Sequence, residues 1–339
     1  MRRVLLLAAL VSAPLFAASG NAGGYHVQQK LVVPGNDGWD YLTVDNAARR
    51  LYVSHGTKVD VLDADSGELK GSIPNTPGAH GIAVAPKLGR GFISCGKAAK
   101  IVVFDLKTLK TLGEVPAGEN PDAIAFDKVS NRVFVSNGGS KSVTVINAAD
   151  SSVAATIDVD GRPENAVSDG KGQVFVGIGG KNAVFAIDAQ KLTISKRLAL
   201  DGCEGPGSMA MDLTNRRLLM ACGGQKMAAV DADTGRVIVT LPICGHNDAT
   251  AYDSETHLAF YSCGDGHVTV VQQASADSYS VLETVSTQEN AKTMTLDPKT
   301  HRLFLSVGEF GPTPAATAEQ PKPKPPVVPG TFRVLVVGK

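Results

Sequence analysis

The chain has 339 residues, with 33 basic and 33 acidic side chains and a hydrophobic content of 43 %. Its length allows one large domain or two small ones, and its balanced charge disfavours a broad basic surface for nucleic acids. With 36 Gly, 18 Pro and 5 % aromatic residues, the composition favours short strands joined by many turns.

Residues 1–22 predict a secretory signal peptide that is not part of the fold. Arg2 and Arg3 precede an almost entirely apolar stretch from Val4 to Ala18, and small residues follow it. This stretch is shorter than the roughly 20 residues that span a membrane, and an uncleaved anchor is the alternative. We therefore expect a periplasmic or secreted protein without a membrane span, folded over residues 24–339.

Seven similar units follow one another along the rest of the chain. Each contains short strands rich in β-branched residues, and a turn follows its first strand. The turns recur about every 42 residues, at Asp45, Pro86, Asp127, Asp169, Asp212, Asp253 and Asp297. A period of this length with four strands per unit is typical of propeller blades. The sequence therefore predicts an all-β protein, a WD40-like seven-bladed β-propeller.

The last unit lacks its fourth strand, because strands are predicted only at residues 293–296, 302–306 and 332–337. A suitable strand, HVQQKLVV, lies at residues 26–33 near the other end of the chain. We expect this N-terminal strand to complete the last blade. Such pairing closes the ring and removes the exposed sheet edges of an open array.

An insertion at residues 308–331 separates the second and third strands of the last unit. Its QPKPKPPVVP core contains five prolines, so we expect it to form an extended polyproline-II loop that cannot pair in a sheet. Two roles stay open for this Pro-rich loop. It is either a surface-packed loop or a docking segment that covers one face.

Four of the five cysteines have matching positions in two units. Cys203 and Cys222 lie nine residues before and ten after the turn residue Asp212, and Cys244 and Cys263 have the same offsets around their own turn residue. Because the first two strands of a blade form an antiparallel hairpin, these offsets place each pair across from one another. We predict the disulfides Cys203–Cys222 and Cys244–Cys263.

The fifth cysteine, Cys95, has no counterpart at the facing position and is predicted to be unpaired. A metal or redox cluster of cysteines is the competing interpretation. It has no Cys-x-x-Cys spacing to support it.

The loops that enter the innermost strands should open onto one mouth of the central channel. Polar and charged side chains stand at or next to this position in most units, and sevenfold symmetry would bring them together. The candidate ligand-binding or cation-binding residues are Asp40, His80, Asp122, Glu164, Asp248, His246, Lys292 and Trp39. Trp39 would either stack on a ligand or plug the channel.

Carboxylates that share such a mouth repel one another, which raises some of their pKa values unless a cation is present. Oxygen ligands suit Ca²⁺ or Mg²⁺, and addition of His80 or His246 would allow a transition metal. A divalent cation is therefore a possible cofactor. The alternative is a hydrated ring whose acids bond to backbone amides at the blade entries.

The chain resembles the YVTN-repeat β-propeller proteins over its whole mature length, with more divergence in the later blades. The motif Tyr-Val-Thr/Ser-Asn, followed by a Val-x-Val-Ile/Leu-Asp strand, is matched by RLYVSHGTKVDVLDADSG and by RVFVSNGGSKSVTVIN, with His for Asn in the first and Phe for Tyr in the second. This resemblance implies an exported bacterial propeller and says little about activity. More distant propellers of similar shape include lactonases, quinoprotein subunits and haem-d1 proteins.

The leading hypothesis is an exported binding or scaffold propeller, a monomer that presents its channel mouth to an unidentified protein or small-molecule ligand. No catalytic set is recognisable, since the Gly-x-Ser-x-Gly, Walker A and Gly-x-Gly-x-x-Gly patterns are absent from the sequence. A metal-dependent, lactonase-like hydrolase that uses the acidic mouth is one alternative. An accessory subunit of a periplasmic redox enzyme is the other.

Overall fold

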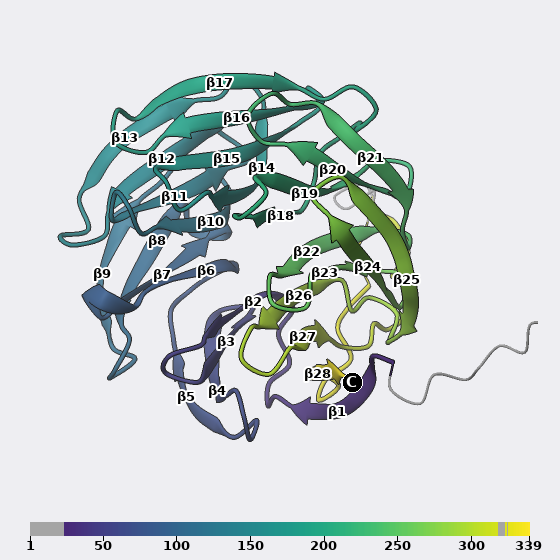
Figure 1. Cartoon of the computed structure of the whole chain (residues 1–339). Helices are drawn as coiled ribbons and strands as arrows, with labels where there is room; N and C mark the ends of the chain where they lie inside the picture. The colour runs from purple at the N-terminus through teal and green to yellow at the C-terminus, as the bar shows by residue number, and fades with distance from the viewer. Residues whose placement is uncertain (1–23, 318–322, 324) are drawn as a thin grey trace, which may run out of the picture.

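The computed structural model describes residues 24–317, 323 and 325–339. In it, seven four-stranded sheets surround a central channel (Figure 1). The predicted seven-bladed β-propeller is confirmed. The predicted signal peptide lies outside the described residues. No helix with the length and apolarity of a membrane span occurs in the part of the chain that the structure describes.

Blades 1 to 6 are built from four consecutive strands each, numbered from the channel outward. Blade 1 contains β2 (Trp39–Asp45), β3 (Arg50–His55), β4 (Lys58–Asp63) and β5 (Leu69–Ile73). Blade 2 contains β6 (Ala79–Ala85), β7 (Arg90–Cys95), β8 (Lys100–Asp105) and β9 (Thr111–Pro116), with two 3-10 turns, η1 (Pro86–Leu88) and η2 (Gly96–Ala98). Blade 3 contains β10 (Pro121–Asp127), β11 (Arg132–Asn137), β12 (Ser142–Asn147) and β13 (Val153–Asp158).

The second half of the ring repeats this order. Blade 4 contains β14 (Arg162–Ser168), β15 (Gln173–Gly179), β16 (Ala183–Asp188) and β17 (Thr193–Ala199). Blade 5 contains β18 (Met209–Asp212), β19 (Arg217–Cys222), β20 (Lys226–Asp231) and β21 (Val237–Pro242). Blade 6 contains β22 (Asn247–Asp253), β23 (Leu258–Cys263), β24 (His267–Ser275) and β25 (Ser278–Ser286). Blade 7 contains β26 (Thr293–Asp297), β27 (Arg302–Val307), β28 (Arg333–Gly338) and β1 (His26–Val32).

Blade 7 is completed by the N-terminal strand, as predicted. β1 runs antiparallel to β28, with partners from His26 and Gly338 at one end to Val32 and Arg333 at the other. Figure 1 shows the two ends of the chain side by side in this blade. The ring is therefore closed by main-chain hydrogen bonds between its first and last strands.

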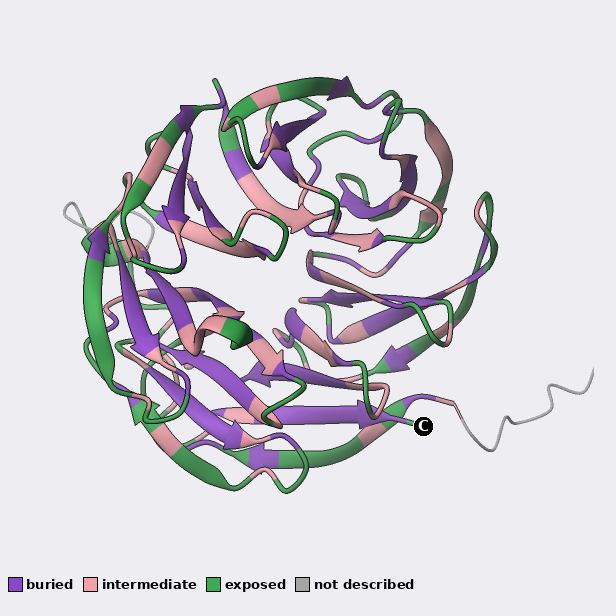
Figure 2. Ribbon diagram, turned by 60° about the vertical axis from the view of Figure 1, so that its left-hand side comes forward, coloured by how far each residue is buried: buried purple, intermediate pink, exposed green. Residues whose placement is uncertain are grey.

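The hydrophobic core is divided into seven clusters, each between two neighbouring blades. The cluster between blades 7 and 1, for example, joins Leu31 and Phe304 to Leu51 and Val53. In Figure 2 the middle strands of the blades are largely buried, while the outermost strands carry many exposed residues. Each middle strand is apolar on both faces because each face packs on an adjacent blade.

The repeated aspartate after the first strand shapes the turn that follows it. The carboxylate of Asp45 accepts hydrogen bonds from the amides of Ala47 and Ala48 at 3.1 and 3.0 Å, and Asp212 does the same for Thr214 and Asn215. An aspartate is favoured here because its short side chain can bond to the backbone of its own turn.

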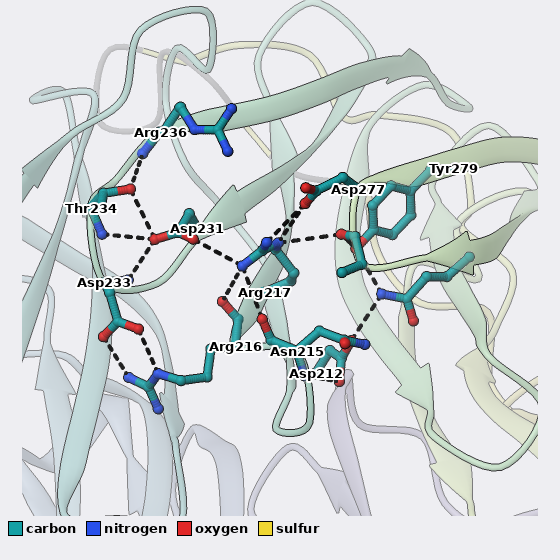
Figure 3. Close-up of polar contacts among 12 residues, drawn as sticks. Asp212, Asn215, Arg216, Arg217, Asp231, Asp233, Thr234, Arg236, Asp277 and Tyr279 are labelled. Carbon is teal, nitrogen blue, oxygen red and sulfur yellow. Dashed lines mark hydrogen bonds and ion pairs between the residues drawn. The ribbon is translucent and has the colours of Figure 1, made fainter.

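Arginines at the start of the second strand connect blades 1, 2, 3 and 5 to the blade that follows. The Arg132 guanidinium donates to the carbonyl oxygens of Ala189 and Gln190 in blade 4, at 2.6 and 3.0 Å. Figure 3 shows the corresponding Arg217 of blade 5, which contacts Asp231 of its own blade at 2.9 Å and Asp277 of blade 6 at 2.8 Å. The recurring arginine thus fixes the spacing of adjacent blades.

The Pro-rich insertion differs from expectation at its base. Phe310 and Val327 form an isolated antiparallel bridge, in which the Gly311 amide donates to Pro326 O and the Val328 amide donates to Glu309 O, both at 2.8 Å. The prediction that this core cannot pair is wrong, because Val328 keeps an amide proton and Pro326 offers its carbonyl.

Both predicted disulfides are present. Cys203–Cys222 and Cys244–Cys263 have Cα–Cα distances of 5.2 and 5.7 Å, and Cys95 is free and buried. Cys244, Cys263 and Asp265 offer potential metal-ligand atoms within 4.8 Å of one another. The two sulfur atoms are bonded to each other, however, so they are not available as thiolates.

Removal of residues 26–33 should strongly destabilise the protein, relative to a control chain that begins at Gly24. The deletion takes the buried Leu31 and Val33 from the core and exposes the edge of β28. Burial of such side chains contributes about 1.5–3 kcal/mol each, so we expect a loss of at least about 3 kcal/mol in urea unfolding. Equal unfolding midpoints for the two chains would contradict ring closure by β1.

Candidate functional site

A polar cavity of about 700 Å³ lies where the innermost strands begin; we call it the funnel. Six of the eight predicted residues line it: Asp40, His80, Asp122, Glu164, Asp248 and Lys292. The four carboxylate side chains keep 17–33 % of their surface exposed, so a ligand can reach them. Other polar lining residues are Tyr41, Asn120, Arg162, Asn165, Ser208 and Asn247.

Local irregularities in the innermost strands aim these side chains into the funnel. In five blades the pairing of the first strand with the second shifts register at the funnel residue: between Trp39 and Leu42, Ala79 and Ile82, Pro121 and Ile124, Pro163 and Ala166, and Asn247 and Ala249. A bulge interrupts strict alternation and redirects a side chain. The same local irregularity therefore turns polar residues of these five blades towards the channel mouth.

Serines of the second strands position the funnel residues of the following blade. Four hydroxyls donate to main-chain carbonyl oxygens: Ser54 to His80 at 2.6 Å, Ser94 to Asp122 at 2.5 Å, Ser262 to Lys292 at 2.5 Å and Ser306 to Asp40 at 2.7 Å. Ser54 and Ser94 are the third residues of their YVSH and FISC segments. The recurring motif thus has a direct structural role in the funnel.

Disulfides occur at the two blade entries where this serine is replaced. Gly177 of blade 4 and Ala221 of blade 5 stand at the serine position, so neither can donate to the next blade. The entries that follow, those of blades 5 and 6, contain Cys203 and Cys244. A covalent link there holds the entry segment that a serine hydroxyl holds in blades 1, 2, 3 and 7.

His80 bridges two of the four carboxylates. Its Nδ1 lies 3.0 Å from Asp40 Oδ2 and 2.9 Å from Asp122 Oδ1. Burial opposes the charged imidazolium, but the contacts with Asp122 and Asp40 outweigh it and raise the pKa of His80 to about 10. Burial also raises the pKa of Asp40, in spite of the contact with His80. His80 is therefore a cation at neutral pH.

The other two carboxylates have basic partners as well. Lys292 Nζ lies 2.8 Å from Asp248, and Arg162 Nε lies 3.3 Å from Glu164. Burial disfavours the charged amine, yet the attraction of Asp248 raises the pKa of Lys292. Burial raises the pKa of Glu164, and Arg162 partly offsets it. Four carboxyl groups thus face three basic groups, and Asp40 and Asp122 share one of them.

Tyr41 and Arg162 were not predicted from the sequence. The Tyr41 hydroxyl donates to the carbonyl of Asp248 at 2.7 Å, so it reaches past blade 7 from blade 1 to blade 6. Burial and the neighbouring carboxylates raise the pKa of Tyr41 well above its ordinary value, which keeps the phenol neutral. Tyr41 borders both the funnel and a smaller cavity of about 70 Å³ in the channel. It therefore forms part of the funnel floor.

Trp39 and His246 lie outside the funnel. Trp39 packs between Phe310 and Phe332, with ring centroids 5.1 and 5.6 Å away, so it neither plugs the channel nor borders the funnel. His246 lines a neighbouring cavity of about 410 Å³ that also contains Cys222 and Cys244. The bulge after Trp39 turns Asp40 and Tyr41 inward in its place.

The donor set of the funnel could hold a divalent cation only in competition with its own basic groups. His80 occupies the space between Asp40 and Asp122, and Lys292 contacts Asp248. A metal bound by these carboxylates would have to displace the imidazolium proton or the ammonium group. Cation binding at this site stays a prediction.

These features define a seven-bladed propeller with a polar, nearly charge-compensated funnel at one mouth. A family model described as "Domain of unknown function (DUF5074)" matches residues 40–264. That match covers most of the chain, so the chain belongs to this family. The resemblance to YVTN-repeat proteins stays a prediction. Among curated proteins, none matches this sequence.

Several solved structures have a similar fold at low sequence identity. A chain of "Kuenenia stuttgartiensis Hydrazine Synthase" has a TM-score of 0.71 at 14 % identity, over 80 % of this chain and 94 % of that one. "Structure of U3-55K" has a TM-score of 0.77 at 11 % identity, over 93 % and 100 %. "Crystal structure of RRP9 WD40 repeats" has a TM-score of 0.76 at 10 % identity, over 91 % and 97 %. At these identities the likeness concerns the fold alone.

NMR titration of His80 should give a pKa of about 10, far above its ordinary 6.5. Because the folded-state pKa is raised, the stabilisation by the imidazolium is fully present below pH 6.5 and is lost as the pH rises through about 10. The unfolding free energy of wild type should therefore fall more over this range than that of His80→Gln. In Asp122→Asn the His80 pKa should drop. A wild-type pKa near 6.5 would contradict the bridge.

The double substitution Cys244→Ser with Cys263→Ser should lower the unfolding free energy by about 3 kcal/mol, the usual value for a loop of this length. It should also broaden the NMR signals of Asp248, because the link holds Cys244, four residues before Asp248, at the entry of blade 6. The control is Cys203→Ser with Cys222→Ser, which should destabilise similarly but leave Asp248 sharp. Equal effects of both variants on Asp248 would refute the local positioning role.

Proposed function

We propose that the protein is an exported binding propeller, whose funnel holds a small polar ligand that carries one positive charge. The observation that carries this proposal is the composition of the funnel. Donors and acceptors surround a cavity of about 700 Å³, in which four carboxyl groups face three basic groups. A protonated amine with further hydrogen-bonding groups complements such a lining.

Export is supported by the disulfides. Paired cysteines persist in oxidising compartments such as the periplasm or the extracellular space, where glutathione does not keep thiols reduced. Both pairs are formed, and Cys95 is buried. The propeller fold itself is compatible with a binding or scaffold role, since it presents loops from seven blades on one rigid face.

A metal-dependent hydrolase has weaker support. Its cation would need the carboxylate pair that His80 already bridges as a cation. The redox-subunit hypothesis receives no support at the level of residues, because the likeness to the hydrazine synthase chain is one of fold.

Isothermal titration calorimetry at pH 7 should detect binding of protonated polyhydroxy amines and amino sugars, and weaker binding of their neutral polyol counterparts. Asp122→Asn combined with Asp248→Asn should weaken amine binding about ten-fold or more. Glu68→Gln, on the exposed carboxylate of a blade 1 turn, is the matched control and should have no effect.

Two results would contradict the proposal. One is the absence of any binding preference for amines over polyols. The other is hydrolysis of lactones or esters that requires Ca²⁺, Mg²⁺, Mn²⁺ or Zn²⁺ and is abolished by Asp122→Asn, which would favour the hydrolase.

A further inference from the structure

A second cavity, of about 720 Å³, lies at the opposite end of the channel. It is lined by the turns that follow the innermost strands of blades 2 to 5, whereas the funnel lies where these strands begin. An innermost strand of seven residues rises about 3.3 Å per residue, so the two cavities open roughly 20 Å apart on different faces. No residue lines both cavities.

The cavity exists because the turn of blade 4 is short and rich in glycine. Gly170 and Gly172 both have positive φ, 64° and 99°, a conformation that favours glycine, and as glycines they present no side chain to the face. A Cβ atom on Gly170 would lie 3.4 Å from Lys128 Cε. The adjacent turns carry Val129 and Leu213, which remain 43 % and 46 % exposed. Apolar side chains of blades 3 and 5 thus flank a hollow at blade 4.

The floor and walls of this cavity are largely apolar, with Phe126 at the end of β10 and Pro86 in the turn of blade 2. Exposed apolar side chains gathered around a concavity are typical of a ligand site. The volume lies within the range of about 300–1,000 Å³ that small-molecule sites occupy.

Two lysines give the cavity a positive charge without an internal counterion. Lys87 and Lys128 both line it, no carboxylate does, and neither ammonium has an ion-pair or hydrogen-bond partner among residues 24–317, 323 and 325–339. Lys128 is exposed, and its ammonium nitrogen lies 3.7 Å from the place that a Cβ atom on Gly170 would take, at the edge of the cavity.

The aspartates of the same turns are already engaged. Asp127 is buried and accepts from the Ser130 amide at 2.7 Å and from the Ser168 hydroxyl at 2.6 Å. Asp169 accepts from the Lys171 amide at 2.8 Å and contacts Arg216 at 3.1 Å. Their charges are therefore satisfied within the turns, and the lysines remain available to an external anion.

We propose that this cavity is a second binding site, for a small organic anion with an apolar body, such as an aromatic or short aliphatic acid. The apolar body packs on Phe126, Val129 and Leu213, and the acid group lies between Lys87 and Lys128. This site is independent of the funnel, which takes ligands of the opposite charge.

The test uses the full chain and the probe 1-anilinonaphthalene-8-sulfonate, with uncharged N-phenyl-1-naphthylamine as its neutral counterpart. Fluorescence titration should show saturable binding of one sulfonate per chain, and NMR should show shifts of the Val129 and Leu213 methyl groups. Lys87→Gln with Lys128→Gln should raise the Kd of the sulfonate about ten-fold, and that of the neutral amine less than about two-fold.

The control is Lys171→Gln with Lys299→Gln, which removes the same charge from two turns of the same face at side chains that do not line the cavity. It should leave the sulfonate Kd nearly unchanged. Equal weakening by the control, methyl shifts that map elsewhere, or titration without saturation would each overturn the proposal.

Discussion

Ring closure through β1 and β28 is the constraint on which the rest of the structure depends. The two strands join the ends of the chain in blade 7, and the cluster between blades 7 and 1 packs behind them. At the end of the channel opposite the funnel, the ion pair of Arg49 with Asp297, at 2.6 Å, joins blades 1 and 7. At the funnel end, the Ser306 hydroxyl donates a hydrogen bond to the carbonyl oxygen of Asp40. Ring closure therefore positions the funnel residue Asp40 as well as completing blade 7.

Three recurring positions of the repeat shape the turns and connect neighbouring blades. An aspartate stabilises the turn after the first strand in six blades, and Pro86 takes its place in blade 2. An arginine at the start of the second strand reaches the next blade from blades 1, 2, 3 and 5. A serine further along that strand holds the next blade entry from blades 1, 2, 6 and 7. Because the contacts run from one blade to the next, the ring behaves as a set of linked neighbours. The disulfides occur where the serine is replaced, so the chain maintains the funnel by covalent means there.

The two ends of the channel have opposite chemical character. The funnel concentrates carboxylates, which are largely compensated by His80, Lys292 and Arg162. The opposite mouth has lysines, while the aspartates of its turns are consumed by their own backbone amides and by neighbouring side chains. One rigid scaffold thus presents two cavities of different chemical character.

The number of blades, the strand that closes the ring, both disulfides and six residues of the funnel could be predicted from the sequence. Short-range hairpin geometry relates the paired cysteines. The fixed period, which repeated turn residues such as Asp127 and Asp212 reveal, gives the blades and shows which strand the last one lacks. Three features are evident only in the folded chain: Trp39 packs away from the channel, Tyr41 and Arg162 join the funnel, and His80 bridges two carboxylates. Bulges break the alternation from which side-chain direction is read, and partners from different blades meet only when the ring closes.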